Sequence, residues 1–296
     1  MKGQKGQPKM RLYLVVVWTV WLTIFSLPCS VFAETDLIRF CYYDPDNEAN
    51  NPMVAVRAMQ PFAEYVGDKI QKTITIHFFI SRKHFDQYLN DHTVSLAIVS
   101  PYYYVENREL RNLVPLAVPF VNESVTYKLI LVTANNAAYR SLPDLKNTRL
   151  VYNALVEENY SFLNRAVFLN RIDISQFFNQ LLDVTTPLAS INTVLDGKAE
   201  CALIVTGLYN TLRELDPRIA KKTKTIFSSG IIPRPPVCYI KGNLAPDLAR
   251  KIAEILFAMR HSTIGQQTLL PFKVDGFKPV ELDPFLHLEK ILKEVK

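Results

Sequence analysis

Tryptophan and glycine are scarce in this 296-residue chain. Both tryptophans, Trp18 and Trp21, lie in the first 33 residues. The nine glycines are too scattered for a phosphate-binding loop or a dinucleotide fingerprint, and no Gly/Ser-rich linker is present. The Gly-x-Ser-x-Gly and His-Glu-x-x-His motifs are also missing, and the five histidines lack metal-ligand spacing with the cysteines. We therefore expect a protein that is not an enzyme and uses no cofactor or metal ion. An enzyme is the third reading, because catalytic groups can be distant in sequence.

An excess of basic charge is confined to the N-terminal end. The whole chain has 34 basic and 28 acidic residues, a net charge of +6. Four of the basic residues (Lys2, Lys5, Lys9 and Arg11) precede residue 34, where no acid occurs, so the remainder carries a net charge of only +2. A nucleic-acid-binding domain needs a basic patch on its folded surface. We therefore expect no nucleic-acid partner.

Residues 1–33 have the three parts of an export signal. The basic stretch precedes a 16-residue apolar run, Leu12–Leu27, which is shorter than the roughly 20 residues that span a bilayer. Pro28 ends the run, and Val31 and Ala33 occupy the −3 and −1 positions of a cleavage site. An uncleaved anchor is the alternative. The pattern predicts a cleaved signal peptide over 1–33 and a periplasmic protein that begins at Glu34.

Three cysteines remain after residue 33, and an odd number cannot be fully paired. Cys41, Cys201 and Cys238 each lie in an apolar, strand-like run, so we expect them to be small core residues. A Cys201–Cys238 disulfide is an alternative that the spacing leaves open, because the periplasm oxidises thiols.

Strand-like and helix-like segments alternate from Leu37 onward, which indicates an α/β fold. Residues 37–43 read as a strand, and alternating apolar residues predict another at 73–79. Helical spacing predicts helices after Asn51-Pro52 and near 176–182. Residues 127–134 read as one long strand. The aromatic run Tyr102–Tyr104 follows a buried strand and is expected to form a loop with exposed rings at the strand's C-terminal end, where ligands of open α/β sheets bind. One or two of the three rings are expected to line the ligand site while another packs in the core.

Five segments occur in an order and at separations typical of one family. They are residues 99–104, 127–132, 141–146, 194–202 and 228–233. With them, the chain from about Ile38 to Leu288 resembles the phosphate/phosphite/phosphonate-binding proteins of bacterial ABC importers.

The resemblance implies a two-lobed type II periplasmic-binding-protein fold, with two mixed sheets flanked by helices and joined by two hinge strands. Lobe one is expected at 34–125 plus 241–296 and lobe two at 126–240. The implied function is capture of a small polar ligand in an interlobe cleft for an ABC permease, by a monomer. The alternative is a ligand-sensing or adaptor subunit that acts on the periplasmic domain of a sensor kinase.

The chain departs from the family at its anion site. Where the family has a Ser-Thr-Ser-Gly turn at a helix N-terminus, this chain has Glu157-Glu158-Asn159-Tyr160. The family's His-Asp pair falls near Pro187 and Leu188, and Glu200 stands where an Asp is usual. We therefore expect a ligand other than simple phosphonate. The expected ligand-binding residues are Tyr43, Ser100, Tyr102, Tyr104, Asn153, Glu157, Glu158, Thr206 and Arg234.

Overall fold

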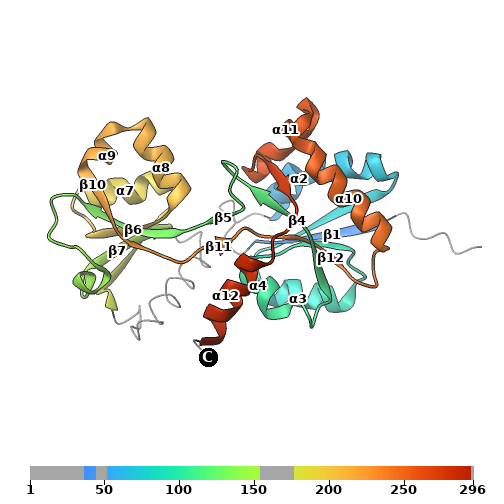
Figure 1. The fold of residues 1–296 in the computed structure, drawn as a ribbon, viewed down its shortest axis with the longest axis horizontal. Coiled ribbons are helices and arrows are strands. Elements are labelled where there is room, and N and C mark those ends of the chain that lie inside the picture. Colours follow the sequence, from blue (N-terminus) through green and yellow to red (C-terminus); the bar gives the residue numbers. More distant parts are fainter. Residues whose placement is uncertain (1–36, 45–51, 154–176, 295–296) are drawn as a thin grey trace, which may run out of the picture. The chain divides into compact units, whose positions relative to one another are not determined.

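The computed structural model describes residues 37–44, 52–153 and 177–294. Their strands form a six-stranded sheet, a five-stranded sheet and a two-stranded ribbon (Figure 1). Both larger sheets mix parallel and antiparallel neighbours and are flanked by helices. The predicted α/β architecture with two mixed sheets is therefore confirmed.

The first sheet has the strand order β13-β4-β12-β3-β1-β2. Strand β1 runs parallel to β2 and β3, and β12 is antiparallel to β3 and β4. Alternation along β1 places Phe40 in the core on one face of the sheet and Tyr43 in the core on the other. The strands are β1 (Leu37–Tyr43), β2 (Thr73–Phe79), β3 (Leu96–Ile98), β4 (Leu113–Phe120), β12 (Val237–Ile240) and β13 (Gly276–Lys278).

Helices cover both faces of the first sheet. Helices α2, α10 and α11 lie on one face, and α3, α4 and α12 lie on the other (Figure 1). The predicted start of α2 at Pro52 is confirmed, and the helix continues through Pro61. The helices are α2 (Pro52–Ile70), α3 (Arg82–Asp91), α4 (Pro101–Asn107), α10 (Pro246–Ala258), η2 (Met259–His261), α11 (Thr263–Leu269), η3 (Leu270–Phe272) and α12 (Asp283–Glu294).

The second sheet has the order β10-β6-β9-β7-β8, and β7 is parallel to both β8 and β9. One face packs against Ile191 and Val194 of α7, Tyr209 of α8 and Ile219 of α9. Its elements are β6 (Leu129–Ala134), η1 (Leu142–Leu145), β7 (Arg149–Asn153), β8 (Gln180–Val184), α7 (Pro187–Leu195), β9 (Cys201–Val205), α8 (Thr206–Leu215), α9 (Pro217–Lys222) and β10 (Thr223–Ser228).

The two-stranded ribbon lies where the chain passes between the sheets. Strand β5 (Thr126–Tyr127) precedes the second sheet, β11 (Ile232–Pro233) follows it, and the two pair antiparallel. Strand β12 then pairs with β3 and β4 in the first sheet, although the expected lobe boundary assigned residues through 240 to lobe two.

Three elements differ from the sequence reading. A helix was expected near 176–182, but residues 180–184 form β8, because the spacing of the apolar residues fits a helix as well as a strand end. The expected strand 127–134 is divided, since β5 ends at Tyr127 and pairs with β11 while β6 begins at Leu129. Strand β4 contains two prolines and had not been expected in a sheet interior.

Candidate functional site

The carboxyl ends of β1 and β3 lie at one edge of the first sheet, because these strands are parallel. Helix α4 begins directly after β3, and Ser100 is its N-cap. The Ser100 hydroxyl accepts a hydrogen bond from the backbone N–H of Tyr103 at 3.1 Å. Ser100 is buried, and its side chain serves the start of the helix.

The tyrosines expected in an exposed loop are in α4, and that expectation is wrong. Tyr102, Tyr103 and Tyr104 are 9%, 2% and 2% exposed. Tyr104 packs edge-on against Phe285 of α12, with ring centroids 5.0 Å apart. Tyr43 is also buried and stacks on Phe85 at 5.2 Å. Helix α4 packs between the sheet and α12, so the three tyrosine rings on its different sides are all buried.

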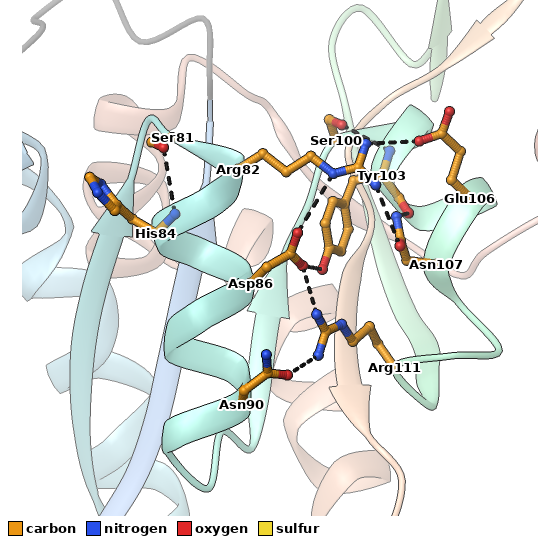
Figure 2. A network of polar contacts seen from close by, with 10 residues as sticks. All are labelled: Ser81, Arg82, His84, Asp86, Asn90, Ser100, Tyr103, Glu106, Asn107 and Arg111. Carbon is orange, nitrogen blue, oxygen red and sulfur yellow. Dashed lines mark hydrogen bonds and ion pairs between the residues drawn. The ribbon is translucent and has the colours of Figure 1, made fainter.

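A polar network holds α4 against α3 (Figure 2). The Tyr103 hydroxyl donates to Asp86 Oδ1 at 2.6 Å, and the guanidinium of Arg111 donates to the same oxygen at 3.0 Å. Arg82 lies over the Tyr103 ring and pairs with Glu106 at 3.0 Å. Burial, followed by the Asp86 carboxylate, raises the pKa of Tyr103 well above its ordinary value, so the hydroxyl stays protonated and donates. The residues are far apart in sequence, and no local motif indicates the network.

The second sheet has a similar edge, where β7, β8 and β9 end at Asn153, Val184 and Val205. Helices α7 and α8 begin there. The Thr186 hydroxyl caps α7 by accepting from the N–H of Ala189 at 3.1 Å. Of Asn153 the structure describes the backbone, which pairs with Val184. Glu157 and Glu158 lie outside the described residues.

Thr206, the first residue of α8, is bonded to the segment that enters the second sheet. Its N–H and its Oγ1 both donate to the Lys128 carbonyl oxygen, at 2.9 Å and 3.1 Å. The start of α8 therefore lies directly beside the end of β5. The Thr206 side chain is partly exposed and donates its hydroxyl proton to Lys128.

Large apolar side chains lie exposed in the first turns of the helices at these sheet edges. Leu188 in α7 is 44% exposed and Leu208 in α8 is 48% exposed. Met53 and Val54 in α2, which follows β1, are 63% and 53% exposed. Sequence reasoning had not assigned these four residues to a site. The sequence signal for them is their position as the second or third residue of a helix, where anion sites carry hydroxyls and free N–H groups.

Arg234 follows β11 and is hydrogen-bonded to the two residues that precede β5. Its N–H donates to the Val125 carbonyl at 3.0 Å and its Nε donates to the Ser124 carbonyl at 3.2 Å. The guanidinium lies 5.8 Å from the centre of the Tyr127 ring. Desolvation by burial lowers the pKa of Arg234 from its ordinary value. The residue is partly buried and belongs to the ribbon.

The remaining candidates for reactivity are inert in the described residues. Cys41, Cys201 and Cys238 are free and buried, and burial raises the pKa of the Cys41 thiol to about 12. Within residues 37–44, 52–153 and 177–294, no three His, Cys, Asp or Glu side chains are grouped closely enough to hold a metal ion. In the same residues, every helix is too short or too polar to cross a bilayer.

Two mixed α/β sheets, joined by a paired ribbon and carrying helix starts at their parallel-strand edges, define the two-lobed type II fold of periplasmic binding proteins. Residues 48–285 match the family model described as "ABC transporter, phosphonate, periplasmic substrate-binding protein". The chain belongs to this family of periplasmic transport components.

Solved structures share the fold at low sequence identity. A protein from Xanthomonas citri bound to ATP, XAC2383, has a TM-score of 0.67 and 14% identity, with 88% of this chain and 98% of that chain covered. PhnD1 from Prochlorococcus marinus in complex with methylphosphonate has a TM-score of 0.63 and 13% identity, with 88% and 98% covered. A binding-protein component of an ABC phosphonate transporter from Pseudomonas aeruginosa has a TM-score of 0.61 and 16% identity, with 88% and 86% covered.

Proposed function

We propose that this protein captures a small polar ligand with an apolar portion and delivers it to an ABC permease. Its ligand is not a simple phosphonate or phosphate. We also propose that residues 1–33 direct export and are removed, which agrees with the periplasmic location of the family. The two lobes, joined by the ribbon, close on the ligand.

The observation that carries the ligand proposal is the apolar character of the helix starts in the second lobe. Anion sites use helix N-termini whose N–H groups and nearby hydroxyls face the ligand. Here Leu188 and Leu208 are each more than 40% exposed in the first turns of α7 and α8. By resemblance, Leu188 lies near the position of the family's His-Asp pair. Exposed leucines there favour a ligand with hydrocarbon surface to bury, at roughly 25 cal/mol per Å².

Fewer of the expected ligand-binding residues are proposed as direct contacts, because some of their side chains are buried in the core. Tyr102, at 9% exposed, retains a proposed ligand contact, while Tyr43 and Tyr104 support it from the core. Ser100, Asn153 and Thr206 are proposed contacts because each lies at the carboxyl end of a strand or at the helix start that follows it. Glu157 and Glu158 are proposed from sequence alone as partners for a cationic or amide group.

The same two carboxylates disfavour a phosphonate. A carboxylate within about 4 Å of a bound anion costs about 4 kcal/mol at an effective dielectric near 20, which is roughly a thousandfold in affinity. The fold itself does not fix the ligand. Its solved relatives were crystallised with molecules as different as methylphosphonate and ATP.

A calorimetric and thermal-shift panel tests the proposal. The probes are phosphate, phosphite, alkylphosphonates, amines and amino acids. We expect binding among the amines or amino acids and none among the phosphorus oxyanions. Glu157→Gln with Glu158→Gln should abolish that binding and leave the melting temperature nearly unchanged. Glu214→Gln, an exposed substitution in α8, is the matched control and should leave binding intact.

Micromolar or tighter binding of a phosphonate would overturn the ligand proposal. The sensing alternative makes a different prediction about gene neighbourhood. Adjacent permease and ATPase genes favour uptake, whereas an adjacent sensor-kinase gene favours signalling. A single species in sedimentation would agree with the expected monomer.

A further inference from the structure

We propose that Arg234 is the anion-binding residue of this protein and that it selects a carboxylate attached to an apolar group. The proposal rests on the proposed function, since it specifies the ligand class for the same site. It depends on the described residues alone: Arg234 itself, the ribbon that holds it, and the first turn of α8.

A hydrogen bond to the chain just before β5 orients the Arg234 guanidinium through its Nε. Arg234 Nε donates to the Ser124 carbonyl at 3.2 Å. The central carbon of its guanidinium lies over the Tyr127 ring, 5.8 Å from the ring centroid. No described residue accepts a hydrogen bond from the two terminal nitrogens of Arg234 in the structure. Those two nitrogens form the fork that binds a carboxylate through two parallel hydrogen bonds.

Arg234 has no close ion-pair partner within the described part of the chain, although the Asp275 carboxylate acts on its charge from farther away and raises its pKa in part. No described carboxylate lies within 4 Å of its guanidinium, although the residue is partly buried and desolvation lowers its pKa. Removing a charge from water without a partner is unfavourable, and a bound anion supplies the missing partner. The contrast is with arginines that do form ion pairs, which are Arg82, Arg108, Arg111, Arg149, Arg218, Arg250 and Arg260.

The surroundings decide between a carboxylate and a phosphonate. The Lys128 carbonyl, one residue beyond Tyr127, accepts both hydrogen bonds from Thr206, so the ribbon adjoins the first turn of α8. In that turn a side chain added at Gly207 would meet no atom within 4 Å, and Leu208 is 48% exposed. One guanidinium fork satisfies a monoanionic carboxylate. A phosphonate dianion needs further hydrogen-bond donors. In the first turn of α8, the exposed Leu208 side chain presents an apolar surface instead.

Four compounds that share a branched apolar chain separate the possible recognition groups. Leucine has a carboxylate and an amine, 4-methylpentanoate has only the carboxylate, leucinamide has only the amine, and 3-methylbutylphosphonate has only the phosphonate. Binding is measured by calorimetry on the full exported protein. We expect leucine and 4-methylpentanoate to bind and leucinamide to bind at least tenfold more weakly than leucine.

Substitutions at Arg234 test the assignment directly. Losing a bidentate charge-assisted interaction should weaken carboxylate binding by about tenfold to a hundredfold in Arg234→Gln. Arg234→Lys keeps the positive charge but cannot form two parallel hydrogen bonds, so it should give a smaller loss of affinity. A graded loss of this kind distinguishes a binding defect from a folding defect. Arg213→Gln is the matched control, because Arg213 also lies over a tyrosine ring, at 5.4 Å from the centre of Tyr209, and should leave binding unchanged.

The outcomes separate the two proposals. If leucinamide or the phosphonate binds as tightly as leucine, or if Arg234→Gln and Arg234→Lys bind carboxylates like the unmodified protein, the Arg234 assignment is wrong. Binding of amines without any carboxylate also overturns the assignment but leaves the proposed function standing. If no compound of any class binds in the wider panel, both proposals fail.

Discussion

At the scale of single residues, Glu200 shows how a family departure can be structural. The Arg149 N–H donates to Glu200 Oε2 at 2.7 Å, and Arg149 Nε donates to Oε1 at 3.2 Å. The carboxylate therefore links the first residue of β7 to the residue that precedes β9. The Glu200 carboxylate is thus used within the second sheet.

Glu200→Gln should lower stability in a pH-dependent way. Hydrogen bonds from Arg149 lower the pKa of Glu200 in the folded state. The contribution of this carboxylate to the free energy of unfolding is therefore fully present above its pKa in the unfolded chain, about 4.3. That contribution is lost as the pH falls through the lower pKa of the folded state. The partly exposed pair should be worth about 2 °C in melting temperature at neutral pH. Melting curves from pH 7 to 3 should show the variant and the unmodified protein converging.

Glu214→Gln is the control for that experiment, because Glu214 is exposed on α8. Its melting temperature should follow the unmodified protein at every pH. A Glu200→Gln deficit that stays constant down to pH 3 would show that the effect comes from packing and not from the ionised carboxylate.

The candidate site was only partly predictable residue by residue. Sequence order placed Ser100 and Thr206 near strand ends, where the structure has them as a helix cap and a first helical residue. Burial was not predictable for Tyr102 and Tyr104, because a run of tyrosines has no period that assigns each ring to solvent or core. That Arg234 forms no ion pair with a described carboxylate was also not visible, since it depends on which distant residues approach it.

At the scale of elements, strands with strict alternation were predictable and irregular ones were not. Strand β2 has the predicted bounds because Ile74, Ile76 and Phe78 alternate with more exposed residues. Strand β1 also has the predicted bounds, from a short and mostly apolar run whose side chains are buried on both faces. Strand β4 escaped prediction because Pro115 removes a backbone donor, and its partner β12 shifts register between Val237 and Cys238 to accommodate it. Such a compensation lies in another strand and cannot be read locally.

Tyr103→Phe should weaken the contact between α3 and α4. The variant loses the 2.6 Å hydrogen bond to Asp86 and keeps the buried ring. A hydrogen bond to a charged group contributes about 1.5–3 kcal/mol, and we expect a loss toward the lower end because Arg111 still binds Asp86. Urea denaturation measures the change in free energy of unfolding.

Tyr65→Phe provides the comparison for Tyr103→Phe. Tyr65 shares a neutral, longer hydrogen bond of 3.3 Å with Ser262 and should lose about 0.5 kcal/mol or less. In a cycle with Asp86→Asn, the two changes at Tyr103 and Asp86 should be non-additive. Equal losses for both tyrosine variants would contradict a special contribution from the Asp86 network.

At the scale of the whole molecule, the fold was predictable from the order of family-like segments, whereas the extent of each lobe was not. Strand β12 lies in the first sheet because it pairs with β3 and β4, a register that the sequence of Val237–Ile240 does not specify. Each sheet has buried side chains on its faces and its own flanking helices. Motion of one sheet relative to the other should therefore concentrate in the segments that join them.

Ligand binding should therefore reduce the radius of gyration measured by small-angle scattering. Next to the ribbon, the Ser229 N–H donates to the Leu129 carbonyl at 2.8 Å and the Ser229 hydroxyl accepts from the Leu129 N–H at 2.9 Å. We therefore expect the two connecting segments to move together when the lobes close. A closing lobe excludes water from the ligand and commits it for transfer. Arg234→Gln, mixed with leucine at the concentration that saturates the unmodified protein, should show a smaller change. An unchanged radius of gyration at saturation of the unmodified protein would instead favour the sensing alternative, because a fixed pair of lobes can present a surface to a kinase but cannot enclose its ligand.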